Sequence, residues 1–251
     1  YKVSKIIRIS EEYRHGMSAL AEFLKTNAEK FRKRMSENEL TSFNNRRGSM
    51  VLDVVSSRQR KYEQRVIPMI RKWELFAEGT TLEIMVTKGC PAKIFGLRSG
   101  EEETIIQIAS NFLEYGKLNG IRDENEICSK WAQEVEDMRF AYDLDPVVGG
   151  VKGIGLALFN YMRMLSGSDT IKPDVRVKKK LEELGFRVPK SDISIMFLCE
   201  SIAKDLDISL IELDQLLWFD FDQVEYDDGA GMLFYTHESQ SWKTIEKLNK
   251  E

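Results

Sequence analysis

Cysteine and histidine are scarce in this sequence. Its 251 residues include three cysteines, Cys90, Cys128 and Cys199, and only two histidines. The cysteines are far apart and form no CxxC pair, so the ligand spacing of a zinc site or an iron–sulfur cluster is missing. They form no disulfide framework either, which favours a reducing, intracellular compartment: the cytoplasm of a bacterium or archaeon, or the nucleus of a eukaryote. We therefore expect no cofactor and no metal centre made of side chains.

Long apolar runs and obvious linkers are also absent. No run approaches the roughly 18 apolar residues that a membrane-spanning helix needs, so we expect no membrane partner. No stretch rich in proline, glycine and serine divides the chain, so two lobes would share an interface and would not hang on a tether. Hydrophobic residues make up 42% of the chain and charged residues 31%, as in an ordinary globular protein. We expect a monomer.

A strong excess of positive charge is missing as well. The net charge of -4 weakens a nucleic-acid interpretation. It does not remove that interpretation, because a local basic patch matters more than the sum. Basic residues cluster in 30–35, 44–48, 56–65 and 176–185. Each cluster alone is typical of a solvated helix face, whereas several that converge would form a DNA-binding surface.

The pattern that dominates the sequence is the helical spacing of apolar residues. It predicts an all-α fold. The helices are expected in 9–34, 49–76 (two helices), 99–120, 123–144, 153–167, 173–186, 191–209, 209–221 and 239–250. The stretch 81–89, "TLEIMVTKG", is rich in β-branched residues and leaves a short helix and a strand equally open.

A glycine-rich turn precedes one of the expected helices. Gly149, Gly150, Gly153 and Gly155 lie within seven residues, and an apolar helix follows them. Such a turn suits anion binding, because the first backbone N–H groups of a helix are unpaired and carry the positive end of its dipole. Lys152 would add a formal charge. The spacing is neither that of a P-loop nor GxGxxG, and a plain helix–helix turn that needs glycine is the alternative.

The turn and the segment after it carry a resemblance. "GGVKGIGLALFNYMRML" followed by "DTIKPDVRV" resembles the helix-hairpin-helix DNA glycosylase superfamily, of which endonuclease III is the best-known member. Gly153, Ile154 and Gly155 match the hairpin, and Asp174 matches the aspartate that follows it. "VVSSRQRKYEQRV" is similar to the S-x-Q helix end of that family, with Ser57 and Gln59 as the match. "IFGLRSGEEETIIQIASNFL" is similar to the segment between the barrel helices, and the four matches lie in the family's order over roughly residues 50–185.

The resemblance implies cleavage of the N-glycosidic bond of a damaged or modified base. The nucleotide would be flipped out of the duplex, and Asp174 would stabilise the positive charge that develops on the sugar and orient a water. The alternative for Asp174 is a plain helix N-cap next to Pro173.

Two departures from the family bear on this chemistry. Bifunctional members carry a lysine two residues past the second glycine of the hairpin, where this chain has Ala157. The resemblance therefore implies a monofunctional enzyme, unless Lys172 takes the place of that amine. The C-terminal cysteine quartet of endonuclease III is also missing, so the resemblance implies packing without an iron–sulfur cluster.

The resemblance also implies which residues contact DNA. The backbone N–H groups of Val151, Gly153 and Gly155 would hold a phosphate, with room for a monovalent cation under the hairpin. The other implied DNA contacts are Arg58, Gln59, Arg60, Lys61, Lys152 and Lys178. For the base pocket, aromatic and polar residues are the candidates, and we name Asn44, Trp131 and Tyr142.

These observations lead to one expected architecture and function. We expect a six-helix barrel in residues 48–167 that carries the hairpin, and a second helical lobe from residues 1–47 and 168–251 that carries Asp174 near its start. The DNA would bind in the cleft between the lobes. The leading interpretation is a monofunctional DNA N-glycosylase that acts on double-stranded DNA. The alternatives are a reader of modified DNA that does not cleave, a bifunctional enzyme that uses Lys172, and a helical interaction protein in which the glycines only form a turn.

Overall fold

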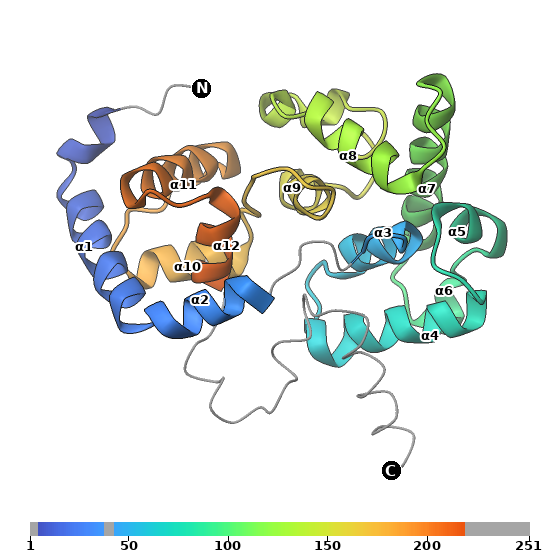
Figure 1. Ribbon diagram of the computed structural model, residues 1–251, viewed down its shortest axis with the longest axis horizontal. Coiled ribbons are helices and arrows are strands. Elements are labelled where there is room, and N and C mark those ends of the chain that lie inside the picture. The colour runs from blue at the N-terminus through green and yellow to red at the C-terminus, as the bar shows by residue number, and fades with distance from the viewer. Residues whose placement is uncertain (1–4, 38–42, 219–251) are drawn as a thin grey trace, which may run out of the picture. The chain divides into compact units, whose positions relative to one another are not determined.

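The computed structural model describes residues 5–37 and 43–218, and within these ranges it contains helices and turns but no strand (Figure 1). The all-α prediction is confirmed for this part of the chain. The stretch that left helix and strand open is a helix, α5 (Leu82–Lys88), which Thr81 caps by accepting the backbone N–H of Ile84. None of the described helices is long and apolar enough to cross a membrane. The helix expected at 239–250 lies outside the described residues.

The chain forms two compact units. We call the first the central unit; its described residues are 43–168. We call the second the terminal unit; its described residues are 5–37 and 169–218. Residues 43–47, which we expected beside the N-terminal segment, belong to the central unit. The reason is local, because Arg47 is buried at the start of α3 and its guanidinium donates to the carbonyl oxygen of Leu165 at 2.9 Å.

The central unit runs from α3 to α9. Its α-helices are α3 (Arg47–Ser56), α4 (Ile67–Ala77), α5 (Leu82–Lys88), α6 (Ala92–Phe95), α7 (Glu101–Leu118), α8 (Glu124–Glu134) and α9 (Leu156–Leu165). Shorter turns of helix are η2 (Tyr62–Val66), η3 (Met138–Phe140) and η4 (Tyr142–Leu144).

Helix α3 is the core of the central unit. Every residue of α3 is buried, and the helix packs against α4, α5, α7, α8 and α9. Large side chains fill the space around it, among them Trp73 of α4, Phe112 of α7 and Phe159 of α9, all fully buried. A helix that is buried on every side lies at the centre of its domain, and its burial fixes where the loops at both of its ends emerge.

The terminal unit combines the two ends of the described chain. It contains η1 (Lys5–Ile9), α1 (Glu11–Thr26), α2 (Ala28–Glu37), α10 (Val175–Glu183), α11 (Asp192–Leu206) and α12 (Leu210–Trp218). Helix α12 packs against α10 and α11. Tyr13 of α1 donates its hydroxyl proton to Asp205 of α11 at 2.8 Å, and Arg8 forms an ion pair with the same carboxylate. The N-terminal segment is thereby joined to the helices that follow residue 169.

Candidate functional site

The turn that precedes α9 is built around one buried carboxylate. Asp145 accepts the backbone N–H groups of Val147, Val148 and Gly149 at 3.1, 2.9 and 2.8 Å. The indole N–H of Trp131 also donates to it, at 3.2 Å. An aspartate that collects the next backbone donors in this way closes a tight turn, which is why an Asp-Pro pair begins this segment.

Three glycines of this turn have separate structural reasons. A Cβ atom on Gly149 would lie 1.9 Å from the carbonyl oxygen of Tyr142, and one on Gly150 would lie 2.7 Å from that of Asp143. Only glycine allows these close approaches. Gly153 has φ +94°, in the left-handed region that side chains disfavour.

The N-terminus of α9 is left open. Gly155 is the N-cap residue and supplies no side chain to bond the first N–H groups of the helix. Gly153 and Gly155 are exposed. Within the described residues, the backbone N–H groups of Lys152, Gly153 and Gly155 donate to no acceptor, whereas that of Val151 donates to the carbonyl of Val148 at 3.1 Å. The N–H group of Val151, an implied phosphate contact, therefore already closes the turn.

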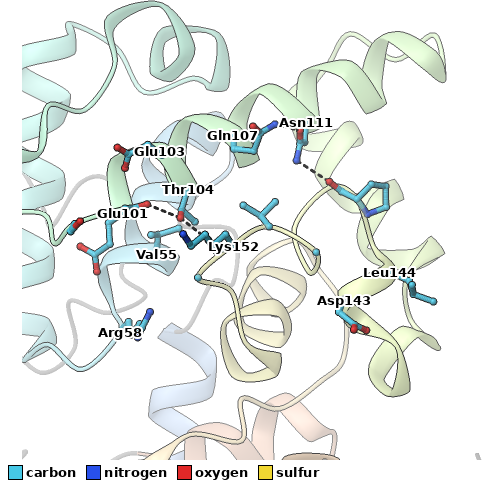
Figure 2. Close-up of a pocket in the computed structure, with 16 residues that line it drawn as sticks. Val55, Arg58, Glu101, Glu103, Thr104, Gln107, Asn111, Asp143, Leu144 and Lys152 are labelled. Carbon is cyan, nitrogen blue, oxygen red and sulfur yellow. Dashed lines mark hydrogen bonds between the residues drawn. The ribbon is translucent and has the colours of Figure 1, made fainter.

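A groove of about 1020 Å³ lies beside this open helix end, within the central unit (Figure 2). Its wall is formed by the start of α7, by the loop after α3 and by the turn itself. Arg58 and Lys152 contribute basic groups, and Glu103 and Asp143 contribute exposed acidic ones. The groove is therefore not strongly basic, and its attraction for an anion comes mainly from the N–H groups and the two cations.

Three of the four segments that carry the resemblance meet at the start of α7. Thr104 of α7 lies within hydrogen-bond distance of the carbonyl oxygen of Lys152, at 2.8 Å, and so holds the turn before α9 (Figure 2). Arg98, just before α7, donates to the carbonyl oxygens of Arg58 and Gln59 at 2.9 and 3.1 Å. The loop after α3 and the turn before α9 are thus fixed on one short helical turn.

The loop after α3 uses one of its predicted DNA contacts internally. The guanidinium of Arg60 forms two hydrogen bonds with Glu101, at 2.9 and 2.7 Å, and both side chains are only 9% exposed. The charge of Arg60, a predicted phosphate contact, is therefore already balanced inside the protein. Arg58 and Lys61 are exposed, and Gln59 is exposed with φ +51°, a conformation that is uncommon outside glycine.

The three base-pocket candidates do not line this groove. Trp131 is 1% exposed and packs edge-on against Phe112 and Phe159, so neither face of its ring can stack on a base. That prediction is wrong, because the ring belongs to the core and its N–H serves Asp145. Asn44 is exposed, and its side-chain oxygen accepts the guanidinium of Arg47 at 3.0 Å. Tyr142 is half-buried and tilted against Phe159, with ring centroids 6.0 Å apart.

The cation that the resemblance allows would need free carbonyl oxygens in the turn. The carbonyl oxygen of Val148 accepts the N–H of Val151, and that of Val151 accepts the N–H of Ile154. The carbonyl oxygen of Lys152 lies within hydrogen-bond distance of the hydroxyl of Thr104. Each of these three oxygens therefore presents at most one remaining lone pair to a cation. Among the described residues no group of three or more histidine, cysteine, aspartate or glutamate side chains could hold a metal ion.

Asp174 lies in the terminal unit, at the start of α10. One of its oxygens accepts the backbone N–H groups of Arg176 and Val177 at 2.9 and 3.1 Å, so the residue caps the helix. Its other oxygen lies 3.6 Å from the amine of Lys172, and the two side chains are 19% and 16% exposed. Both the cap and the ion pair hold the carboxylate in a fixed position. Lys178, a predicted DNA contact in the same helix, forms an ion pair with Asp192 at 2.7 Å.

Sequence reasoning missed a second carboxyl group near Asp174. Asp214 of α12 is 4% exposed, and it accepts the backbone N–H of Lys172 at 3.0 Å. Burial raises its pKa to about 7. The signal was present, because "SLIELDQLLWFDF" places this aspartate beside Leu213, Leu216 and Leu217, which are all buried. An acidic residue on an apolar helix face indicates a buried carboxyl group with a specific partner.

No protein-family model, no curated protein and no solved structure matches the chain.

Proposed function

We propose that the protein is a monofunctional DNA N-glycosylase of the helix-hairpin-helix type. The observation that carries the proposal is the uncapped N-terminus of α9, which follows a turn whose residues 150–153 line a groove together with Arg58. Unpaired N–H groups at the positive end of a helix are a natural phosphate site. Because Glu103 and Asp143 also line the groove, we expect it to hold one phosphate of a DNA strand and not a run of them.

The central unit, in which seven α-helices are described, would then take the place of the six-helix barrel of this family, with the turn before α9 as its hairpin. The N–H groups of Gly153 and Gly155 would bind the phosphate, and Lys152 would add its charge. Arg58 and Gln59 would contact the duplex from the loop after α3. This assignment leaves out three of the predicted residues, because each has a partner inside the protein. The N–H of Val151 closes the turn, the charge of Arg60 is paired with Glu101, and the ring of Trp131 lies in the core with its N–H on Asp145.

Asp174 would carry the chemistry. As the bond between base and sugar breaks, the base leaves with the bonding electrons and the sugar develops an oxocarbenium-like positive charge. A fixed carboxylate stabilises that charge and orients the water that completes the hydrolysis. The two N–H groups on one oxygen of Asp174 hold the residue in place, while the other oxygen faces Lys172.

Two alternatives each have an observation in their favour. Both oxygens of Asp174 are engaged, as expected if the residue is only a helix cap in a protein that reads modified DNA without cleaving it. The amine of Lys172 lies 3.6 Å from Asp174, as a bifunctional enzyme would require if that amine attacked the sugar. The interaction protein in which the glycines only form a turn is the weakest alternative, because that turn lines a groove.

The test is a cleavage panel. Duplexes that contain uracil, a thymine mismatch, an alkylated purine, oxidised guanine or a modified cytosine are incubated with the protein and read with and without hot alkali. For one of these bases we expect strand breaks that need alkali, and a loss of at least 100-fold in rate for Asp174→Asn. Asparagine keeps the helix cap, so the variant should fold and bind DNA as the wild type does.

Asp169→Asn is the matched control, because Asp169 is exposed, precedes α10 and accepts the backbone N–H of Ile211 at 3.0 Å. It should cleave at the wild-type rate. Breaks that appear without alkali, together with a borohydride-trapped complex that Lys172→Met abolishes, would favour the bifunctional enzyme. Binding that tells modified from unmodified DNA, without any cleavage, would favour the reader.

A further inference from the structure

One buried carboxyl group of the terminal unit has no part in the function proposed above. Asp214 lies in the middle of α12 and is 4% exposed. Carboxyl groups are rarely buried to this extent, because the loss of hydration is costly unless specific partners compensate for it. Its partners therefore indicate what the residue does.

Those partners belong to the segment that ends in Asp174. The Oδ1 atom of Asp214 accepts the N–H of Lys172 at 3.0 Å. The carbonyl oxygen of Lys172 in turn accepts the N–H of Asp174 at 2.7 Å, and its amine lies 3.6 Å from the Asp174 carboxylate. Lys172 thus connects the two carboxyl groups through its main chain and its side chain. Since Pro173 stands between Lys172 and Asp174, the main chain there has little freedom to adjust.

The charges around Asp214 come from three elements. Burial raises the pKa of Asp214 to about 7, and the Asp174 carboxylate raises it as well. The hydrogen bond from the Lys172 N–H and the charge of the Lys172 amine lower it. On α11, burial and the nearby Asp214 raise the pKa of the Cys199 thiol, so this thiol stays neutral. Gln215 of α12 donates its amide to Asp214 at 3.4 Å.

We propose that Asp214 is a positioning residue for Asp174: it fixes the Lys172–Asp174 segment against α12 and competes with Asp174 for the charge of the Lys172 amine. This role rests on the proposed function, because Asp174 is the group that it positions. When Asp214 is protonated, it no longer competes with Asp174 for the charge of the Lys172 amine. When Asp214 is ionised, Asp174 and Asp214 share the charge of the Lys172 amine. The net negative charge that Asp174 presents to the sugar is then larger. A cationic transition state is then stabilised more strongly.

The first test needs no substrate. The carboxyl carbons of aspartate are followed by NMR as a function of pH in the wild type and in variants. We expect one aspartate with a midpoint near pH 7 that is missing in Asp214→Asn. Its midpoint should fall in Asp174→Asn, which removes a like charge, and should rise in Lys172→Met, which removes a cation. Asp169→Asn, which removes a more distant carboxylate, should leave it unchanged. Midpoints that are the same in all variants would overturn the proposal.

The second test uses the duplex that the cleavage panel identifies. The rate of base release should rise about tenfold as the pH passes 7, the effect of one pK unit of coupling, at constant KM. In Asp214→Asn the rate should stay at the low-pH level throughout. A variant that keeps the wild-type pH profile would refute the positioning role. If the midpoints shift as expected but no duplex is cleaved, the glycosylase proposal fails and the coupling of Asp214 to Asp174 and Lys172 stands.

Discussion

Helices α9 and α10 begin in opposite ways. Helix α9 follows a turn of glycines, its N-cap residue has no side chain, and nearby N–H groups donate to no acceptor in the described residues. Helix α10 follows a proline, and Asp174 bonds two of its first N–H groups. The first helix end is open to an anion, whereas the second already holds one.

The difference shows how one physical feature can serve two purposes. The positive end of a helix attracts negative charge in both cases. At α9 the N-cap residue supplies no such charge, and under the proposed function a DNA phosphate would supply it. At α10 the charge is a side chain, which the helix end holds in place and which a cation such as Lys172 can approach.

The stability of the terminal unit, in which Asp174 caps α10, should depend on pH. The pKa of Asp214 is about 7, against its ordinary value of 3.8, so the folded protein keeps a proton that the unfolded chain releases. Its contribution to stability is complete below pH 3.8 and is lost as the pH rises to about 7. Relative to Asp214→Asn, the wild type should lose up to about 3 kcal/mol in free energy of unfolding between pH 5 and pH 8. Urea denaturation at several pH values measures this, and a constant difference between the two proteins would contradict it.

The stability of the turn before α9 should depend on glycine at some positions and not at others. Gly149→Ala would place a Cβ atom 1.9 Å from a carbonyl oxygen, so we expect it to cost about 2–3 kcal/mol. Gly155→Ala has no atom within 4 Å of the new Cβ and an extended backbone that any residue can adopt. It should be neutral or stabilise the fold by about 0.5 kcal/mol. Thermal and urea unfolding of the two variants test this pair, and equal losses would mean that the turn is not formed as described.

Converting the open end into a closed one should abolish phosphate binding. In Gly155→Asp the new carboxylate can accept N–H groups of the first turn of α9, as Asp174 does for α10. Stability should change by only a few tenths of a kcal/mol. Affinity for a fluorescent duplex should fall at least tenfold, because a fixed negative charge occupies the phosphate position. Gly155→Ala is the control that keeps the end open, and an affinity that is the same in both variants would place the DNA elsewhere.

The smallest effect should come from the lysine beside the open end. Lys152→Gln removes one phosphate contact, so the slope of log affinity against log salt concentration should decrease by about 0.9. Lys117→Gln, at the exposed C-terminal end of α7, should leave the slope unchanged. Fluorescence anisotropy at several salt concentrations gives both slopes. If the two variants have the same slope, Lys152 does not contact the backbone.

Much of the helical architecture follows from local signals in the sequence. The helix predicted in 173–186 is α10: Pro173 and Asp174 precede its first residue and Gly185 follows its last turn, and proline, capping side chains and glycine all act within one helical turn. The short helix α5 could not be decided from its β-branched residues. Thr81 and Gly89 settle it, since a cap at each end outweighs a weak preference for strand.

The sequence did not reveal contacts between residues that are far apart in the chain. Arg60 and Trp131 have the residue types that bind DNA and stack on bases, but their partners, Glu101 and Asp145, are 41 and 14 residues away. No spacing rule connects such pairs. Asp214 was overlooked for the same reason, because its partner Lys172 is 42 residues away. The glycine turn was easier to recognise, since its closing bonds span at most five residues.

The hydroxyl group of Thr104 lies 2.8 Å from two carbonyl oxygens, that of Gly100 in its own helix and that of Lys152 in the turn before α9. A hydroxyl group carries a single proton, so it can serve only one of them fully at any moment. The link between α7 and the turn is therefore weaker than its 2.8 Å distance alone indicates, because its one proton is shared with a bond inside α7.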